Sequence, residues 1–383
     1  MQGRIHHLYR DEQGMSFVYV GMGFMGFLAA STLAIDVGMF MTARAQSQNA
    51  ADAGALAGAV ALVQNSYTDR SSSGPAVQGA INTAQSNKIM GDVPSVLTGD
   101  VSFPTDPATG QADRVQVQVY RSGARGNAVP TLMGSLFGVQ TVDITAVATA
   151  EASPANAMTC VKPFMIPDKW SEKQNPPWDT NDTFDMFDNH GAPLPNPDVY
   201  VGAKDPGYTG YSVANDKGTV LVLRSGSDIN PSFYYSWKMP GDTGGNFYRD
   251  NIANCNQTTM HWDDPIIQEP GDKSGPTIQG INDLIAKDPN TYWDTSCNCV
   301  KGSAYGTSPR VFPIPLYDPA FYATGKANGR PADFKIANFL GFYADHTSGN
   351  SIYGRITNVT GLVDPDAGPA PDGAFPRAIR LVQ

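Results

Sequence analysis

The segment MSFVYVGMGFMGFLAASTLAI, residues 15–35, decides how this chain is organised. The whole run from Gly14 to Ile35 contains no charged residue. A helix of about 21 residues is about 30 Å long, which matches the hydrocarbon core of a bilayer. The segment therefore predicts one transmembrane helix. A removed secretory signal is the alternative, but its apolar stretch would be shorter, about 7 to 15 residues, and would end at a cleavage site.

The flanking charges predict the orientation of this span. Four basic or imidazole side chains precede it: Arg4, His6, His7 and Arg10. Asp36 follows it directly. Because positive residues are retained in the cytoplasm, we expect residues 1–14 to form a cytoplasmic tail and the chain after the span to be exported.

Composition agrees with export of a large region. The chain has 383 residues, a formal net charge of -10 and a pI near 4.9. The roughly 340 residues after the span are enough for one or two hydrophobic cores. Nucleic acids are not expected as partners, because phosphate binding requires clusters of Lys and Arg that the sequence lacks.

Four cysteines follow the span: Cys160, Cys255, Cys297 and Cys299. An even number in an exported chain predicts two disulfides, with three possible connectivities. A bridge between Cys297 and Cys299 would close a strained ring, so we expect each of them to pair with Cys160 or Cys255. Zinc binding is the alternative, but metal-binding cysteines usually occur as Cys-x-x-Cys pairs, and none occurs here.

The helical pattern continues past the span into an alanine-rich, proline-free stretch, Val37 to Leu62. Small residues recur at every fourth position and form two ladders. The first ladder is Gly26, Ala30, Ala34 and Gly38, and the second is Ala50, Gly54 and Gly58. Such a face allows another helix to approach closely. Whether the ladders serve another chain or a tight contact within this one stays open.

Residues 36–150 are expected to form the rest of this helix and a small α+β module. A second helix is predicted from Pro75 to Asn87. The alternation RVQVQVYR predicts a half-buried strand, Arg114 to Arg121. Leu97 to Phe103 and Val142 to Ala150 are its expected partners, with a short helix at Pro130 to Phe137.

Composition changes at residues 151–158, which are expected to be a linker. Residues 159–383 are rich in proline, glycine and aromatic residues, which predicts a β-rich, disulfide-bonded domain. The apolar runs expected as strands are Val220 to Leu223, Val311 to Leu316, Ile336 to Tyr343 and Ala378 to Val382. One helix is predicted in this half, Thr277 to Lys287. The fold class is α+β.

The run AIDVGMFMTARAQSQNAADAGALAGA, Ala34 to Ala59, resembles the N-terminal signature of TadG-like (TadE/TadG) proteins of Tad, or Flp, pilus assembly. The motif residues Asp36, Gln48, Ala51 and Asp52 carry the resemblance, and Gly54 stands where the family often has alanine. The resemblance implies a single-pass protein of the bacterial inner membrane whose partners are other Tad or envelope proteins, and a homo-oligomer is compatible with it. The prepilin cleavage pattern is missing, because position 19, five residues after Gly14, is Tyr.

One polar segment suggests a metal. The sequence DTNDTFDMFDN, residues 179–189, supplies Asp179, Asn181, Asp182 and Asp185 as oxygen ligands of the kind that calcium prefers. A solvated acidic loop is the alternative. No other cofactor is expected.

Two functions follow from these patterns. The first is a membrane-anchored structural component that acts by helix packing and protein contacts. The alternative is a tethered module that binds a carbohydrate or surface ligand through exposed aromatic residues, which are dense in the second half: Trp170, Trp178, Tyr234, Tyr235, Trp237, Trp262, Tyr292 and Trp293. Enzymatic activity is not expected, because no HExxH, Gly-x-Ser-x-Gly or Walker motif occurs. The dinucleotide fingerprint formed by Gly21, Gly23 and Gly26 lies inside the span and has no βαβ unit around it.

Overall fold

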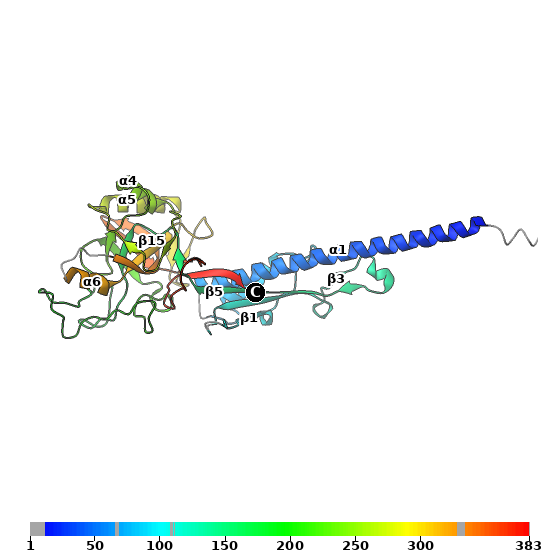
Figure 1. Cartoon of the computed structure of the whole chain (residues 1–383), viewed down its shortest axis with the longest axis horizontal. Helices are drawn as coiled ribbons and strands as arrows, with labels where there is room; N and C mark the ends of the chain where they lie inside the picture. Colours follow the sequence, from blue (N-terminus) through cyan, green and yellow to red (C-terminus); the bar gives the residue numbers. More distant parts are fainter. Residues whose placement is uncertain (1–11, 66–68, 108–109, 111, 328–333, 383) are drawn as a thin grey trace, which may run out of the picture. The chain divides into compact units, whose positions relative to one another are not determined.

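The computed structural model describes residues 12–65, 69–107, 110, 112–327 and 334–382. The chain divides into two compact units (Figure 1). Unit 1 comprises residues 1–58, 70–150 and 381–383, and unit 2 comprises residues 59–69 and 151–380. The basic residues expected to orient the span lie outside the described residues, as does most of the expected cytoplasmic tail.

Unit 1 is built on the helix α1, Glu12–Gln64, which continues into unit 2 at its end. Because this stretch contains no proline and is rich in alanine, nothing interrupts the helix. The second helix, α2, Pro75–Ser86, begins with proline at its first turn, where the missing N–H has no intrahelical partner to lose. Both helices confirm the sequence prediction.

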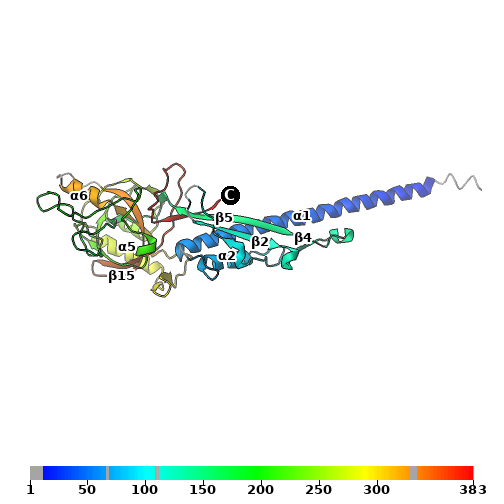
Figure 2. The same ribbon diagram turned by 90° about the horizontal axis from the view of Figure 1, so that it is seen from below.

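A four-stranded sheet with the order β1-β2-β5-β17 packs with these helices (Figure 2). β2, Arg114–Arg121, alternates half-buried and buried residues as its sequence predicts, and β1, Val101–Ser102, pairs with it antiparallel. The remaining sheet strands are β5, Ile144–Pro154, and β17, Arg377–Val382. A short hairpin joins β3, Val129–Pro130, to β4, Thr141–Val142.

Three local expectations differ from the structure of unit 1 and the segment after it. The segment 130–137 is not an α-helix but holds the end of β3 and the 3-10 helix η3, Gly134–Phe137, which stops at Gly138 because that residue adopts a left-handed conformation, with φ +85°. In 97–103 only Val101–Ser102 is a strand, and Thr98–Asp100 forms the 3-10 turn η1, in which the Asp100 carboxylate accepts the Leu97 N–H at 2.8 Å. The expected linker 151–158 instead ends β5 and forms β6, Ala157–Met158, because its alanines are buried. The remaining short element is η2, Gly123–Arg125.

Unit 2 contains a sheet that closes on itself. Its seven strands have the order β11-β15-β14-β7-β9-β8-β16, and β15 also pairs with β16. β15, Phe334–Ser348, closes the barrel because it is long enough to pair with β14 in its first half and β16 in its second. The other strands are β7, Phe164–Pro167; β8, Val220–Ser225; β9, Phe233–Ser236; β11, Pro265–Ile266; β14, Val311–Tyr317; and β16, Ser351–Ile356.

In its described residues unit 2 also has two small two-stranded sheets and four helices. One sheet pairs β6 with β10, Met260–His261, and the other is a hairpin of β12, Tyr292–Asp294, and β13, Cys299–Lys301. The helices are α3, Val213–Asp216; α4, Gly245–Ala253; α5, Ser274–Lys287; and α6, Pro319–Ala327. The core beneath them joins strand residues such as Phe164 and Leu340 to Ile252 of α4 and Ile281 of α5.

The helix α5 confirms its prediction, whereas α3, α4 and α6 were not predicted. The sequence of α4, GNFYRDNIA, contains few strong helix formers. Its partner α5 stabilises it instead, because Arg249 donates to the Asp283 carboxylate through Nε at 2.6 Å and Nη2 at 3.0 Å. Gly280 of α5 lets the helices approach so closely that an added Cβ would lie 2.7 Å from the Cβ of Ile252.

Candidate functional site

The first part of α1, Met15 to Ala30, has no other described residue packed over it. Every side chain from Met15 to Ala30 is exposed, and Phe17 is 82% exposed. Figures 1 and 2 show no other element of unit 1 beside this part of the helix. Exposure of so many apolar side chains to water is unfavourable, by about 25 cal/mol for each Å². The helix is long and apolar enough to cross a membrane, which would remove these side chains from water.

The first ladder lies on this bare part of the helix. Ala30, Ala34 and both glycines are exposed, and a Cβ added at Gly26 or Gly38 would meet no atom within 4 Å. Nothing within the described chain occupies this face. It is therefore open to another helix.

The second ladder packs within unit 1. A Cβ added at Gly54 would lie 2.9 Å from the Cβ of Ala84, and one added at Gly58 would lie 2.7 Å from a methyl group of Val115. Ala50 is fully buried. The small residues thus let α2 and β2 approach α1 closely. Of the two alternatives that the sequence left open, the structure places this ladder in a contact within the chain.

Asp36 binds the loop between β3 and β4, a contact that the sequence did not predict. Its carboxylate is 5% exposed and accepts backbone N–H groups from Leu132 at 3.0 Å, Met133 at 3.1 Å and Gly134 at 2.6 Å. The end of the apolar run is thereby bonded to residues almost 100 positions later, which sequence spacing alone does not reveal.

One comparison with known proteins bears on this helix. Residues 15–61 match the family model Tad, described as "Putative Flp pilus-assembly TadE/G-like". Residues 15–61 are a Tad segment. The match confirms the resemblance of Ala34 to Ala59, and it lies within α1. No curated protein and no solved structure matches the chain.

The remaining motif residues of the Tad segment join α1 to the sheet. Gln48 donates its amide to the Asp52 carboxylate at 2.9 Å and to the Val147 carbonyl of β5 at 3.2 Å. Ala51 is fully buried beside them. Gln48 therefore links the helix to the strand.

The cysteine pairing differs from the prediction. Cys160 is bonded to Cys255, and Cys297 is bonded to Cys299, so the expectation that neighbouring cysteines would not pair is wrong. The turn of the β12–β13 hairpin explains the short bridge. Asn298 adopts a left-handed conformation, with φ +52°, and brings the flanking Cα atoms to 5.2 Å, which is within the usual range for a disulfide.

The segment expected to bind calcium uses its carboxylates to close turns. Asp179 accepts the N–H of Asn181 at 2.6 Å, and Asp182 accepts the N–H of Asp179 at 2.5 Å. The N–H of Asp185 donates to Asp198 at 2.8 Å. Among the described residues, no three His, Cys, Asp or Glu side chains are grouped to hold a metal ion. Calcium binding here stays a prediction.

The tryptophans pack inside unit 2. Trp170, Trp237 and Trp262 are buried, and Trp178 and Trp293 are half-buried. Trp170 makes edge-to-face contacts with Trp178 and Phe184, as buried aromatic clusters do. Trp170, Trp237 and Trp262 therefore belong to the core, and Trp178 packs against it. Trp293 lies beside Tyr343.

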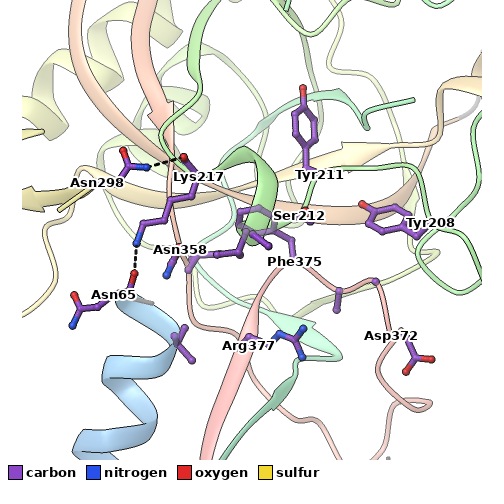
Figure 3. Close-up of a pocket in the computed structure, with 16 residues that line it drawn as sticks. Asn65, Tyr208, Tyr211, Ser212, Lys217, Asn298, Asn358, Asp372, Phe375 and Arg377 are labelled. Atoms are coloured by element: carbon purple, nitrogen blue, oxygen red, sulfur yellow. Dashed lines mark hydrogen bonds between the residues drawn. The ribbon is translucent and has the colours of Figure 1, made fainter. Parts of the chain in front are cut away.

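Unit 2 also contains a cavity of about 510 Å³ (Figure 3). Its wall includes Asn65 at the end of α1, and Figure 3 shows Lys217 reaching to it. Lys217 Nζ donates to the carbonyls of Gln64 at 2.8 Å and Asn65 at 3.1 Å, which satisfies carbonyls that the end of the helix leaves free. The lysine thus caps α1, and its bonds give it a structural role.

A buried carboxyl lies beside this cavity. Asp168 accepts the hydroxyl of Tyr200 at 2.9 Å, that of Tyr208 at 2.8 Å, and the backbone N–H groups of Lys169 and Tyr211. Burial raises the pKa of Asp168 to about 6, against the effect of these donors. The carboxyl ties the segment 200–211 to the end of β7. The sequence offered no signal for it beyond an isolated aspartate.

Lys162 is a buried cation near the Cys160–Cys255 bridge. It is 3% exposed, and its Nζ donates to the carbonyls of Asn254 at 2.6 Å and Asn251 at 3.4 Å. Burial, with a smaller contribution from the charge of Lys287, lowers the pKa of Lys162 to about 7. Keeping this group charged therefore costs free energy in the folded state.

We expect unit 2 to become more stable as the pH rises from 7 to 9. The folded state then binds fewer protons at Lys162 than the unfolded state, whose lysine stays protonated, so the free energy of unfolding increases by about 2 kcal/mol. Urea titrations followed by tryptophan fluorescence at both pH values measure this. Lys162→Met removes the increase, whereas Lys173→Met, at an exposed position, retains it. An equal increase in wild type and Lys162→Met would contradict the assignment.

Proposed function

We propose that this protein is a membrane-anchored structural component of a Tad pilus or a related envelope apparatus. The Tad match of residues 15–61 supports a pilus-related role. The single observation that carries the proposal is the division of α1. Its second ladder is packed inside unit 1, whereas the residues of its first ladder are exposed and a Cβ added at Gly26 or Gly38 would meet no atom within 4 Å.

The N-terminus is cytoplasmic and the two units are exported in this proposal. Arg4 and Arg10 before the span, against Asp36 directly after it, support that orientation. Two disulfides support an oxidising compartment beyond the inner membrane. The exported units then contact pilus or envelope proteins, and the span packs against their helices or against further copies of this chain.

Helix packing through the first ladder has a physical basis in the bilayer. Lipid chains are as apolar as leucine, so no hydrophobic force drives two membrane helices together. Association depends on close van der Waals contact, which glycine and alanine permit. The ladder of Gly26, Ala30, Ala34 and Gly38 supplies such a contact along about 18 Å of helix.

Photo-crosslinking in intact cells tests this role. A photoreactive residue at Ala30 lies on the ladder, and one at Leu28 lies about 200° around the helix. Both positions are exposed in the isolated chain. We expect Ala30 to capture this chain or another Tad component several-fold more efficiently than Leu28. Equal capture, or normal pili in cells that lack the protein, would refute the proposal.

The alternative, a tethered binding module, is less well supported. It requires exposed aromatic side chains on the β-rich domain, and all five tryptophans are buried or half-buried. Glycan binding by the exported region alone, lost on substitution of Tyr292, which is 53% exposed, would favour this alternative.

A further inference from the structure

We propose that residues 131–140, the loop between β3 and β4, form a second membrane contact that lies on the bilayer surface beside α1. We call this segment the interface loop. Asp36 holds the loop at that depth, and Leu132, Phe137 and Val139 enter the layer of lipid headgroups. The proposal rests on the membrane anchoring proposed above.

The position of the loop along α1 is set by Asp36. This residue directly follows Ile35, the last residue of the uncharged run, and its carboxylate accepts three successive N–H groups of the loop. Figures 1 and 2 both place the β3–β4 hairpin beside α1, farther toward the N-terminal end of the helix than the rest of the sheet. The loop therefore sits where the span leaves the hydrocarbon core.

The helix surface around Asp36 stays apolar beyond this point. Val37 is 43% and Met41 is 70% exposed, and the next charged residue is Arg44. Met15 to Met41 spans about 40 Å of helix, which equals a bilayer with its headgroup layers. Asp36 is the one charge within that length, and the loop covers it. The loop thus removes a carboxylate from contact with lipid.

The chemistry of the loop suits a lipid surface. The sequence contains no charged residue from Gly126 to Val142. Phe137 is 71% exposed, Leu132 is 55% exposed and Val139 is 49% exposed, so the folded chain does not bury them. Apolar side chains at this depth gain free energy by entering the headgroup and acyl boundary. Because the loop carries no cation, neutral lipids are sufficient.

Fluorescence quenching in proteoliposomes tests the contact. The full-length protein is placed in phosphatidylcholine vesicles containing lipids with a shallow nitroxide quencher. All four native cysteines are disulfide-bonded, so one introduced cysteine carries the fluorophore. Leu132→Cys reports the loop. Leu97→Cys is the matched control, because Leu97 has the same 55% exposure and belongs to the η1 end of unit 1, which contacts α2. Phe27→Cys reports the span.

With the shallow quencher we expect about five-fold stronger quenching at Leu132 than at Leu97. In parallel vesicles whose lipids carry the nitroxide deep in the acyl chains, we expect strong quenching at Phe27. Quenching at Phe27 but not at Leu132 would overturn the loop contact and leave the anchor intact. Absence of quenching at Phe27 would overturn the anchor itself. Equal quenching at Leu132 and Leu97 would indicate adsorption of the whole unit and would also overturn the proposal.

The role of Asp36 is tested by Asp36→Ala in the same assay. Without the carboxylate the loop loses the acceptor of three N–H groups, so quenching at Leu132 is expected to fall several-fold while quenching at Phe27 is unchanged. Unchanged hydrogen exchange in α2 verifies that unit 1 is folded. Undiminished quenching at Leu132 would show that Asp36 does not hold the loop at the bilayer.

Discussion

Replacement of Cys160 and Cys255 by alanine is expected to lower the free energy of unfolding of unit 2 by about 4 to 5 kcal/mol. The bridge joins residues 95 positions apart, and a disulfide removes more entropy from the unfolded chain as the closed loop lengthens. All five tryptophans lie in unit 2, so fluorescence during denaturant unfolding reports this unit directly.

The second disulfide is the matched control for the first. Cys297 and Cys299 are two positions apart, and the same entropic relation gives only about 1.6 kcal/mol for their bridge. The double alanine variant of this pair is therefore expected to lose about a third as much stability. Equal losses for the two pairs, or no loss for the long bridge, would contradict the entropic account.

The substitution Gly58→Leu is expected to destabilise unit 1 by roughly 3 kcal/mol, at the upper end of the range for overpacking. An added Cβ would already lie 2.7 Å from Val115 and 3.3 Å from the carbonyl of Ala76, so α2 and β2 must both move away from α1. Hydrogen exchange in peptides of α2 and β2 measures the effect, and exchange is expected to become roughly 100-fold faster.

Gly38→Leu provides the control for this change. The same side chain is added to the same helix, but no atom lies within 4 Å of the new Cβ. Exchange in α2 and β2 is expected to stay unchanged, because leucine favours the helix more than glycine does. If both variants accelerate exchange equally, the packing assigned to the second ladder is wrong.

Local sequence was sufficient where a single segment decides its own structure. The uncharged run from Gly14 to Ile35 predicted an apolar helix, the alternation from Arg114 to Arg121 predicted β2, and Pro75 predicted the start of α2. Each signal depends on side chains within a few residues of one another. Length, period and backbone restriction are local properties, so no distant partner was needed.

Distant partners decided the rest. Helix α4 exists because Arg249 and Gly280 join it to α5. The barrel closes because β16 pairs with β8 and β14 pairs with β7, strands that lie far apart in the sequence. The alanines of 151–158 predicted a linker, but in the structure they are buried and belong to β5 and β6 or lie between them.

The candidate site divides in the same way. The sequence alone determined that the chain carries an apolar, Tad-type helix with two ladders of small residues and four cysteines. Only the tertiary structure decided which ladder is occupied, which cysteines pair and what Asp36 binds. The physical reason is that the local sequence determines whether a segment forms a helix and whether that helix favours lipid or water. Contacts between residues far apart in the chain depend on the path of the whole folded backbone.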